Sequence, residues 1–176
     1  MAKSDSFFIR AQVNANNDLS FNQVGIDLGA YVDALGKSVL RIHNIAVQVT
    51  DTTGTTVRMI AGGTNGESAN AKAQFQLTTQ TQIAMVTGLD KSVIATGQLT
   101  ASNMDNSVNF PSIVSESFDN LPQLWTNGYL VAVDQIFLGG SASSGFDEDV
   151  VFTVVMECTV ESMSTAAAMA LALSQQ

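Results

Sequence analysis

The sequence predicts an all-β fold, on three observations. Residues 149–162, DVVFTVVMECTVES, place apolar side chains at every second position, which is the pattern of a long, half-buried strand. Shorter segments of strand-forming residues recur between turn signals rich in Gly, Asn and Asp. No helical segments alternate with them, which argues against a parallel sheet with crossover helices. We expect a β-sandwich or barrel in one domain over residues 1–176.

Most of the predicted strands lie in the first two thirds of the chain. The expected elements are, in order, strands at 6–15 and 19–28, a helical turn or loop at 27–36, a strand at 39–49, a turn at 50–56, its return strand at 56–62, a polar loop at 62–73, one or two strands at 73–88 and a strand at 92–102. In the turn TDTTGTT, Gly54 is expected to supply a positive φ.

His43, the only histidine, is predicted to mark a β-bulge or a sheet corner. Leu40 and Ile42 point to one side of the expected strand, whereas Ile45 and the valines after it occupy odd positions. The apolar phase therefore slips by one residue at His43–Asn44, and a bulge or a bend is what absorbs such a slip. A catalytic or metal-binding role for His43 would need partners, and the chain has no second histidine.

Residues 103–128 are the least regular part of the sequence. They hold both prolines, Pro111 and Pro122, and the only tryptophan, Trp125. Long irregular connections in compact domains are usually functional or interface loops, and aromatic residues often anchor their contacts. Phe118 and Trp125 are therefore interface candidates. The alternative is that both side chains pack into the end of the core.

The segment 129–140, YLVAVDQIFLGG, is predicted to be one strong strand, followed by a turn. Three consecutive acids in that turn, Asp147, Glu148 and Asp149, could bind calcium through their carboxylate oxygens. They lack the spaced Asp-x-Asp pattern of a dedicated calcium loop, so a solvated acidic turn is the alternative. The sequence indicates no other cofactor.

The long strand at 149–162 and the residues after it complete the predicted fold. Cys158 lies on the apolar face of that strand, which predicts a buried core thiol and not a nucleophile. As the only cysteine, it also excludes an intrachain disulfide. Residues 164–176, STAAAMALALSQQ, are rich in helix formers and predict a short C-terminal helix or a tail that becomes ordered on a partner.

Charge is sparse and unevenly distributed. The chain is 13% charged with a net charge of −9, all Lys and Arg lie in residues 1–91, and residues 92–176 carry only acids. Direct nucleic-acid binding is not expected, because neutralising phosphates needs clustered Lys and Arg. No secretory signal is recognisable, and no segment approaches the roughly 18 apolar residues that span a membrane. These patterns predict a protein made in the cytoplasm, with no signal peptide and no transmembrane segment.

No arrangement of catalytic residues is recognisable, so an enzyme is not expected. A Ser-His-Asp site would need His43 as its base, and no GxSxG turn is present. One Cys and one His cannot make a zinc site.

Four segments carry a resemblance to a known family. FFIRAQV, VLRIHNIAVQV, YLVAVDQIFL and VVFTVVMECTV, with the long connections between them, resemble the single jelly-roll capsid proteins of icosahedral viruses. The resemblance covers most of the chain as a pattern and includes no sequence motif. It implies a jelly-roll-like β-sandwich of about eight strands. It also implies a structural coat protein that is made in the host cytoplasm, self-assembles into an icosahedral shell and is located in the virion.

The chain departs from that family at its N-terminus. Many small capsid proteins of this kind have a basic N-terminal arm, whereas MAKSDSFFIR carries only Lys3 and Arg10. The resemblance then implies a shell that does not hold the genome in this way. Its partners would be neighbouring copies, one of which receives the C-terminal segment, and a second capsid protein or an internal membrane. The alternative function is an extracellular or virion-borne, lectin-like module with calcium at Asp147–Asp149 and a sugar stacked on Trp125.

Overall fold

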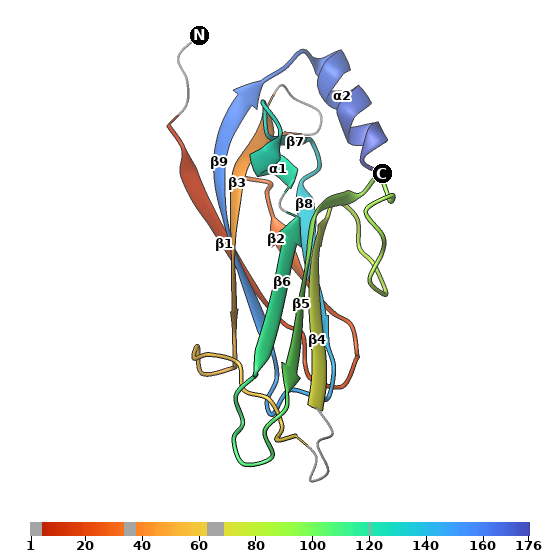
Figure 1. The fold of residues 1–176 in the computed structure, drawn as a ribbon. Coiled ribbons are helices and arrows are strands. Elements are labelled where there is room, and N and C mark those ends of the chain that lie inside the picture. The colour runs from red at the N-terminus through yellow and green to blue at the C-terminus, as the bar shows by residue number, and fades with distance from the viewer. Residues whose placement is uncertain (1–4, 34–37, 63–68, 120) are drawn as a thin grey trace.

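The computed structural model describes residues 5–33, 38–62, 69–119 and 121–176 (Figure 1). Within them the chain forms nine strands and two short helices. The strands are β1 (Phe7–Asn14), β2 (Asn22–Asp27), β3 (Ser38–Thr50), β4 (Ala69–Thr78), β5 (Val93–Asn103), β6 (Ile113–Asp119), β7 (Tyr129–Val131), β8 (Gln135–Ala142) and β9 (Val151–Ser162). The helices are α1 (Leu121–Leu124) and α2 (Thr165–Ser174).

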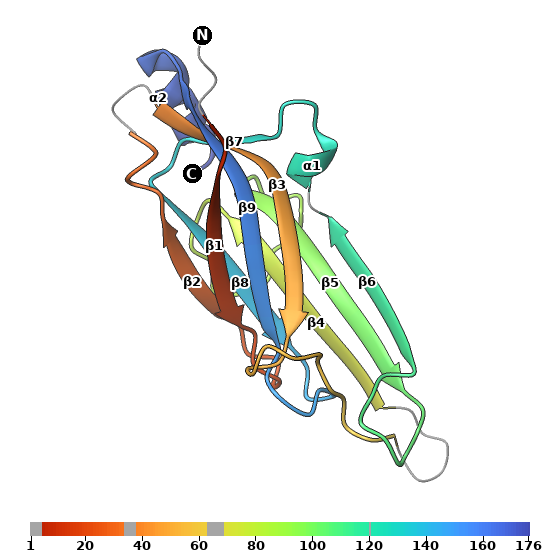
Figure 2. The same cartoon turned by 90° about the vertical axis from the view of Figure 1, so that its left-hand side faces the viewer.

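The strands form two antiparallel sheets that pack face to face (Figures 1 and 2). One sheet has the strand order β1-β9-β3-β7 and the other the order β2-β8-β4-β5-β6. Only β4, β5 and β6 pair with their neighbours in sequence, because every other connection crosses from one sheet to the other. With β6 set apart as an added edge strand, four strands face four in the double Greek-key order of a jelly roll. The predicted jelly-roll sandwich with a short C-terminal helix is confirmed.

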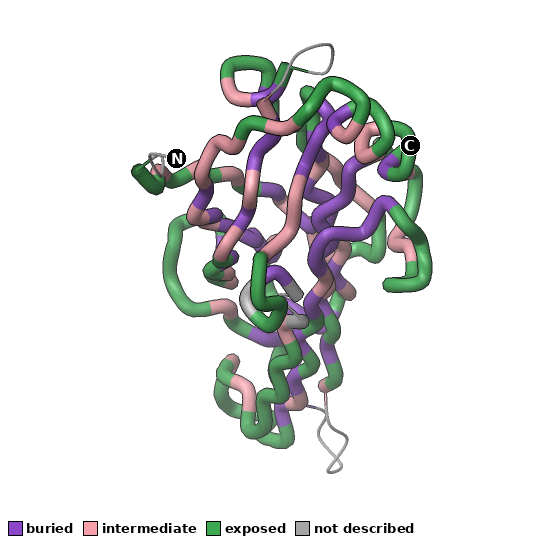
Figure 3. Tube along the Cα trace, turned by 90° about the horizontal axis from the view of Figure 1, so that it is seen from above, coloured by how far each residue is buried: buried purple, intermediate pink, exposed green. Residues whose placement is uncertain are grey.

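The core lies between the two sheets and receives side chains from both. Phe75 of β4 and Phe152 of β9 meet across it, with ring centroids 5.5 Å apart. Viewed from above, buried positions run along the strands in the middle of the sandwich and exposed positions form the loops around them (Figure 3). Burying one large apolar side chain contributes about 1.5–3 kcal/mol, so this shared core is what holds the sheets together.

β9 is a central strand of the four-stranded sheet and pairs with β1 on one side and β3 on the other. Its even-numbered residues from Phe152 to Cys158 are buried, whereas Thr153, Val155 and Glu157 are only half-buried. The predicted alternation is confirmed, and the even-numbered side chains face the core.

His43 occupies a β-bulge, as predicted. The register between β3 and β9 shifts between Ile42 and Asn44, so His43 is the extra residue on β3. As a result Ile42, before the bulge, and Ile45, after it, are both buried despite their opposite phase in the sequence.

The segment 129–140 forms two strands where the sequence predicts one. β7 belongs to the four-stranded sheet and β8 to the five-stranded sheet. Between them Ala132–Asp134 carries the chain from one sheet to the other, and the Asp134 carbonyl accepts a hydrogen bond from the Leu28 N–H. The sequence does not reveal this crossing, because Val131 before it and Ile136 after it are both buried. The apolar pattern therefore continues through the crossing as it would through a single strand.

The predicted return strand at 56–62 is wrong. In that segment the structure has only an isolated bridge, between Met59 and Phe146. The segment 73–88, for which the sequence leaves one or two strands open, contributes only the end of β4, and residues 79–92 form a loop. Conversely, the irregular segment 103–128 contains β6 and α1.

Asp51 organises the turn after β3. Its Oδ1 accepts hydrogen bonds from the backbone N–H groups of Thr53 (2.8 Å) and Thr55 (2.9 Å), and its Oδ2 accepts one from the Thr55 hydroxyl (2.6 Å). Gly54 has a φ of +84°, as predicted. The hydrogen bonds from Thr55 and Thr53 hold the pKa of the Asp51 carboxyl well below its ordinary value, because they favour its charged form.

Asp51→Asn should destabilise the protein at pH 7 and have progressively less effect as the pH falls. Because the folded-state pKa of Asp51 is depressed, its stabilising contribution is complete above the unfolded value of about 3.9. That contribution is lost as the pH falls through this value toward the folded pKa. Thermal unfolding of wild type and variant at pH 7 and pH 3 checks this. A difference in midpoint that does not narrow at pH 3 would contradict a stabilising role for the charged carboxylate.

α2 packs against the sandwich of the same chain, at the end where β7 lies (Figure 1). Ser164 caps its first turn, and Ala168 is buried against Val39 and Ala132. Beyond the helix, the Gln175 side chain accepts a hydrogen bond from the Ala132 N–H at 3.0 Å. These contacts confirm the short C-terminal helix that the sequence predicts, and a contact of this segment with a neighbouring copy stays a prediction.

Candidate functional site

Loop 79–92 carries two large apolar side chains that are almost fully exposed. Ile83 is 98% exposed and Leu89 is 94% exposed. The loop joins β4 to β5 and projects from the outer side of the five-stranded sheet (Figure 1). Single exposed apolar residues are common on protein surfaces, but exposed apolar groups that gather on one segment mark contact sites.

The chain's own hydrogen bonds hold this loop. Gln76 of β4 donates from Nε2 to the Ala84 carbonyl (3.1 Å), and its Oε1 accepts from the Val86 N–H (2.8 Å). Gln23 of β2 accepts two further hydrogen bonds from the loop. Ile83 is therefore exposed on a backbone that is fixed on both sides of it.

The C-terminal segment fastens the start of the loop. The Gln175 carbonyl accepts hydrogen bonds from the Thr79 hydroxyl (2.7 Å) and the Gln80 amide (3.3 Å). α2, which ends next to Gln175, also has exposed apolar residues. We call the exposed apolar side chains of these two neighbouring segments the loop–helix surface: Ile83, Leu89, Met169 and Leu173.

A second exposed apolar set lies at the opposite end of the sandwich, in the connections that follow β3 and β5 (Figure 2). Asn103 joins these connections by donating from Nδ2 to the carbonyls of Ile60 (3.1 Å) and Val108 (2.7 Å). We call this set the opposite-end surface: Ile60, Met104, Val108 and Phe110.

Trp125, an interface candidate from the sequence, lies between α1 and β7 and is 45% exposed. Its ring stacks on Tyr129, with centroids 5.8 Å apart and an interplanar angle of 26°. Arg41 fixes this connection, since its guanidinium pairs with Glu161 and donates to the Asn127 carbonyl. The exposed part of the ring is available to a partner, and its role as an anchor stays a prediction.

Phe118, the other interface candidate, is half-buried on β6. It packs on Phe75, with ring centroids 5.9 Å apart, at the margin of the core. The Phe118 ring thus packs against the core, as the alternative interpretation expects, whereas part of the Trp125 ring is exposed. A contact of Phe118 with a partner stays a prediction.

The three acids at 147–149 have separate surroundings. Asp147 Oδ2 lies 3.8 Å from Arg58 Nη2, and Asp149 Oδ2 accepts a hydrogen bond from Asn14 Nδ2 at 2.9 Å. Glu148, between them, is exposed. Across the described ranges, no three His, Cys, Asp or Glu side chains are grouped so as to hold a metal ion. Calcium binding by Asp147–Asp149 stays a prediction.

His43 and Cys158 lie on opposite faces of the four-stranded sheet. His43 Nε2 is 2.9 Å from Thr159 Oγ1. Cys158 is buried, and this burial, with a smaller contribution from the Glu157 charge, raises the pKa of its thiol to about 12. The thiol is therefore protonated at neutral pH and unsuited to nucleophilic attack. Cys158 is the core residue that the sequence predicts.

Sequence reasoning missed both exposed apolar surfaces. In TQTQIAMVTGLDK, residues 79–91, apolar residues occur at irregular intervals after the strand pattern of β4 ends. Their spacing matches neither the period of a strand nor that of a helix, and this mismatch was the available signal of an exposed apolar segment. Of the helices that the structure describes, neither is long and apolar enough to cross a membrane.

No protein-family model and no curated protein sequence matches the chain. Solved structures of viral capsid proteins are similar to it. The VP1 chain of the Merkel cell polyomavirus unassembled pentamer is 10% identical, with 92% of this chain and 97% of that chain covered and a TM-score of 0.40. A chain of Desmodium yellow mottle tymovirus is 8% identical, with 93% and 90% covered and a TM-score of 0.34. A chain of maize chlorotic mottle virus is 7% identical, with 93% and 96% covered and a TM-score of 0.32.

The resemblance to capsid proteins that the sequence indicates is thus also found among solved structures. Because their TM-scores are below 0.5, these similarities carry no argument about function.

Proposed function

We propose that the chain is a structural capsid subunit that assembles with further copies of itself into an icosahedral shell. The observation that carries the proposal is the almost complete exposure of Ile83 and Leu89 on a backbone that Gln76 holds in place. Apolar surface of this kind gains about 25 cal/mol for each Å² that a partner removes from water. A fixed loop also loses little conformational entropy when the partner binds.

Two apolar surfaces on different parts of one subunit favour a shell over a simple dimer. The loop–helix surface and the opposite-end surface lie in opposite halves of the sandwich (Figure 2). A subunit with a single self-complementary surface closes as a pair, whereas one with two different surfaces contacts at least two neighbours. Repetition of both contacts builds a larger assembly, which in this proposal closes into a shell.

The low charge of the chain supports the same proposal. Only 13% of residues are charged, against about 25% in an ordinary soluble domain. Interface cores are depleted in charged residues, because burying a charge costs more than burying an amide or hydroxyl group. A surface of Thr, Asn, Gln and Ser can therefore serve as subunit contact over much of its area.

The proposed subunit leaves the genome to other components. Among the described basic residues, Arg41 pairs with Glu161 and Arg58 lies beside Asp147. The remaining described bases are on separate elements: Arg10, Lys72 and Lys91. Such a distribution does not provide the clustered cations that bind phosphates. A second capsid protein or an internal membrane is the partner we propose for the inside of the shell, and the virion is the proposed location.

The mass of the purified protein in solution tests this function. Light scattering of the wild type should show particles of many subunits. The double variant Ile83→Ser, Leu89→Ser should need about tenfold or more protein to assemble, because two apolar side chains no longer gain from burial. Its thermal unfolding should match that of the wild type, since neither side chain contributes to the core.

Ala84→Ser is the matched control, because it adds a hydroxyl to an exposed residue of the same loop without removing an apolar side chain. It should assemble as the wild type does. A wild type that stays monomeric at every concentration would contradict assembly by this chain alone. EDTA should leave the particle mass unchanged. A monomer whose stability falls in EDTA would instead favour a calcium-dependent module at Asp147–Asp149.

A further inference from the structure

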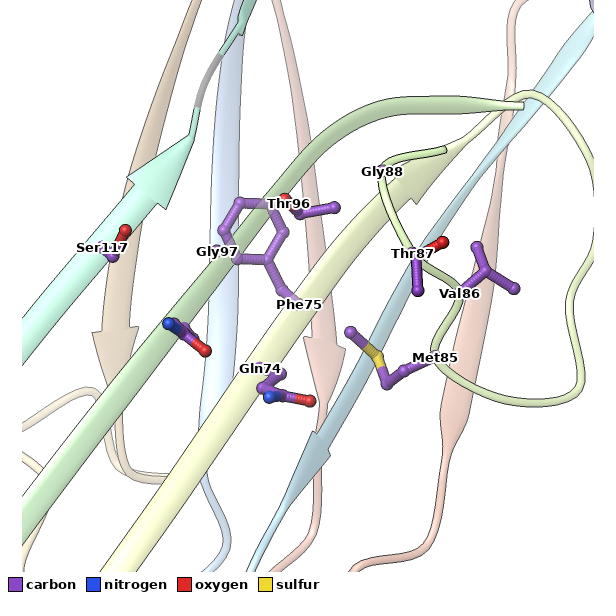
Figure 4. A pocket seen from close by; sticks show the side chains of 10 residues that line it. Gln74, Phe75, Met85, Val86, Thr87, Gly88, Thr96, Gly97 and Ser117 are labelled. Atoms are coloured by element: carbon purple, nitrogen blue, oxygen red, sulfur yellow. The ribbon is translucent and has the colours of Figure 1, made fainter. Parts of the chain in front are cut away.

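A hollow of about 380 Å³ lies on the outer face of the five-stranded sheet (Figure 4). β4, β5 and β6 form its floor, and Met85–Gly88 of loop 79–92 form its wall. Its volume is within the roughly 300–1,000 Å³ of small-molecule sites. It is separate from Trp125 and from the acids at 147–149, which do not line it.

The polar side chains of the hollow are uncharged and have no hydrogen-bond partner among the described residues. They are two amides and three hydroxyls: Gln74, Gln98, Thr87, Thr96 and Ser117. Two other polar side chains on the same face, Gln76 and Ser102, are paired within the chain. Gln76 bonds to Ala84 and Val86, and Ser102 donates to Asn70 Oδ1 at 2.7 Å. The unpaired groups around the hollow leave their donors and acceptors to an occupant.

The wall supplies a small apolar surface opposite these groups. Met85 and Val86 are half-buried and line the hollow. Gln76 fixes this wall by its bonds to Ala84 and Val86 on either side of the Met85 side chain. The wall is therefore in place before a ligand arrives, which reduces the entropy cost of binding.

We infer that this hollow binds a neutral saccharide. Amides and hydroxyls donate and accept hydrogen bonds, as sugar hydroxyls do, so each can pair with either role of a sugar OH. The thioether of Met85 and the isopropyl group of Val86 suit the C–H face of a sugar ring. Among the lining residues that the structure describes there is no Lys, Arg, Asp or Glu, so phosphates, carboxylates and metal ions find no opposite charge among them. This binding goes beyond shell assembly and would give a virion a contact with glycans.

Saturation-transfer NMR and calorimetry with glucose, galactose, N-acetylglucosamine, lactose and maltose test this inference. At least one of these sugars should bind, and glucose 6-phosphate should bind less well than glucose. The variant Gln74→Ala, Gln98→Ala should weaken binding about tenfold or more. Thr96→Val should weaken it about 2- to 10-fold, which is the range for the loss of one hydrogen bond. Thr100→Val is the matched control, because Thr100 lies on the same strand and the same face but outside the hollow, and it should bind as the wild type does.

Each other result would overturn the inference. The inference is wrong if no sugar of this set binds at millimolar concentration. It is also wrong if Thr96→Val and Thr100→Val change the binding equally. The measurements are made on the wild type and on Ile83→Ser, Leu89→Ser, whose side chains do not line the hollow. Sugar binding to the unassembled variant alone would show that a neighbouring subunit fills the hollow in the shell, and would also overturn the inference. Failure of assembly with retained sugar binding would count against the shell proposal only.

Discussion

Phe152→Ala should lower the free energy of unfolding by about 3–5 kcal/mol, the range for removing a fully buried aromatic ring. Phe152 of β9 is completely buried and meets Phe75 of β4 between the two sheets, with ring centroids 5.5 Å apart. Its loss would leave a cavity at the place where the sheets hold each other. Chemical denaturation followed by circular dichroism measures the change.

Phe8→Ala is the matched control, because it removes the same ring from a position that is 55% exposed. Phe8 lies under the Arg10 guanidinium, with 5.8 Å from Cζ to the ring centroid. An exposed contact of this type contributes about 0.5–1 kcal/mol, so the control should cost about 1 kcal/mol at most. Equal losses from the two substitutions would contradict the assignment of the core to the space between the sheets.

Gly128→Ala should destabilise the protein by about 2–5 kcal/mol, from a left-handed backbone and from overpacking together. Gly128 has a φ of +62°, which disfavours any side chain. A Cβ at Gly128 would also lie under 3.0 Å from the Ile42 carbonyl oxygen, a backbone atom beside the His43 bulge. Neither backbone can yield easily, so β7 should detach from β3.

The only tryptophan of the chain reports this change. Trp125 precedes Gly128 and stacks on Tyr129, so its fluorescence should shift in the Gly128 variant before global unfolding. Gly54→Ala is the control, since Gly54 also has a positive φ but a Cβ there meets nothing within 4 Å. It should cost about 1–2 kcal/mol and leave the Trp125 spectrum unchanged. Similar losses at both glycines would contradict the close contact at the bulge.

Local pattern was sufficient for the parts of the fold where one face is buried and the other is not. The even-numbered residues of β9 face the core because half of that strand is covered, and period two then appears in the sequence. The bulge at His43 was predictable for the same reason, since both phases of β3 had to be buried.

Pattern failed where tertiary contacts decide the outcome. Residues 132–134 look like the middle of a strand, yet they connect two sheets. Residues 79–88 follow β4 in the segment for which the sequence leaves a second strand open, yet they lie in a loop whose backbone is hydrogen-bonded to the Gln76 amide. Gln76 is completely buried, but nothing in the sequence distinguishes it from Gln74, the other glutamine of β4.

The candidate site shows the same limit. Trp125 could be singled out because it is unique in the chain, and it is exposed as an interface residue needs to be. The hollow at Gln74 and Gln98 could not be identified from the sequence. Its residues lie on three strands and a loop, and only the strand register brings them together. Until the register of the strands is known, any polar side chain on the outer face of a sheet is an equally good candidate for a binding site.

The place of β9 in the four-stranded sheet sets an order for the maturation of the nascent chain. β1 and β3 do not pair with each other, because each is joined to the sheet through β9. While the ribosome makes the intervening segments, the backbone N–H and C=O groups along the β9 edge of both strands have no strand to pair with. Strands this far apart in the sequence pair slowly, because the chain loses the entropy of closing the loop before the new contacts contribute any stabilising free energy. The sandwich can therefore close only after synthesis of β9. Until β9 is made, β1 and β3 can pair with wrong strands. A chaperone would therefore matter most during this interval.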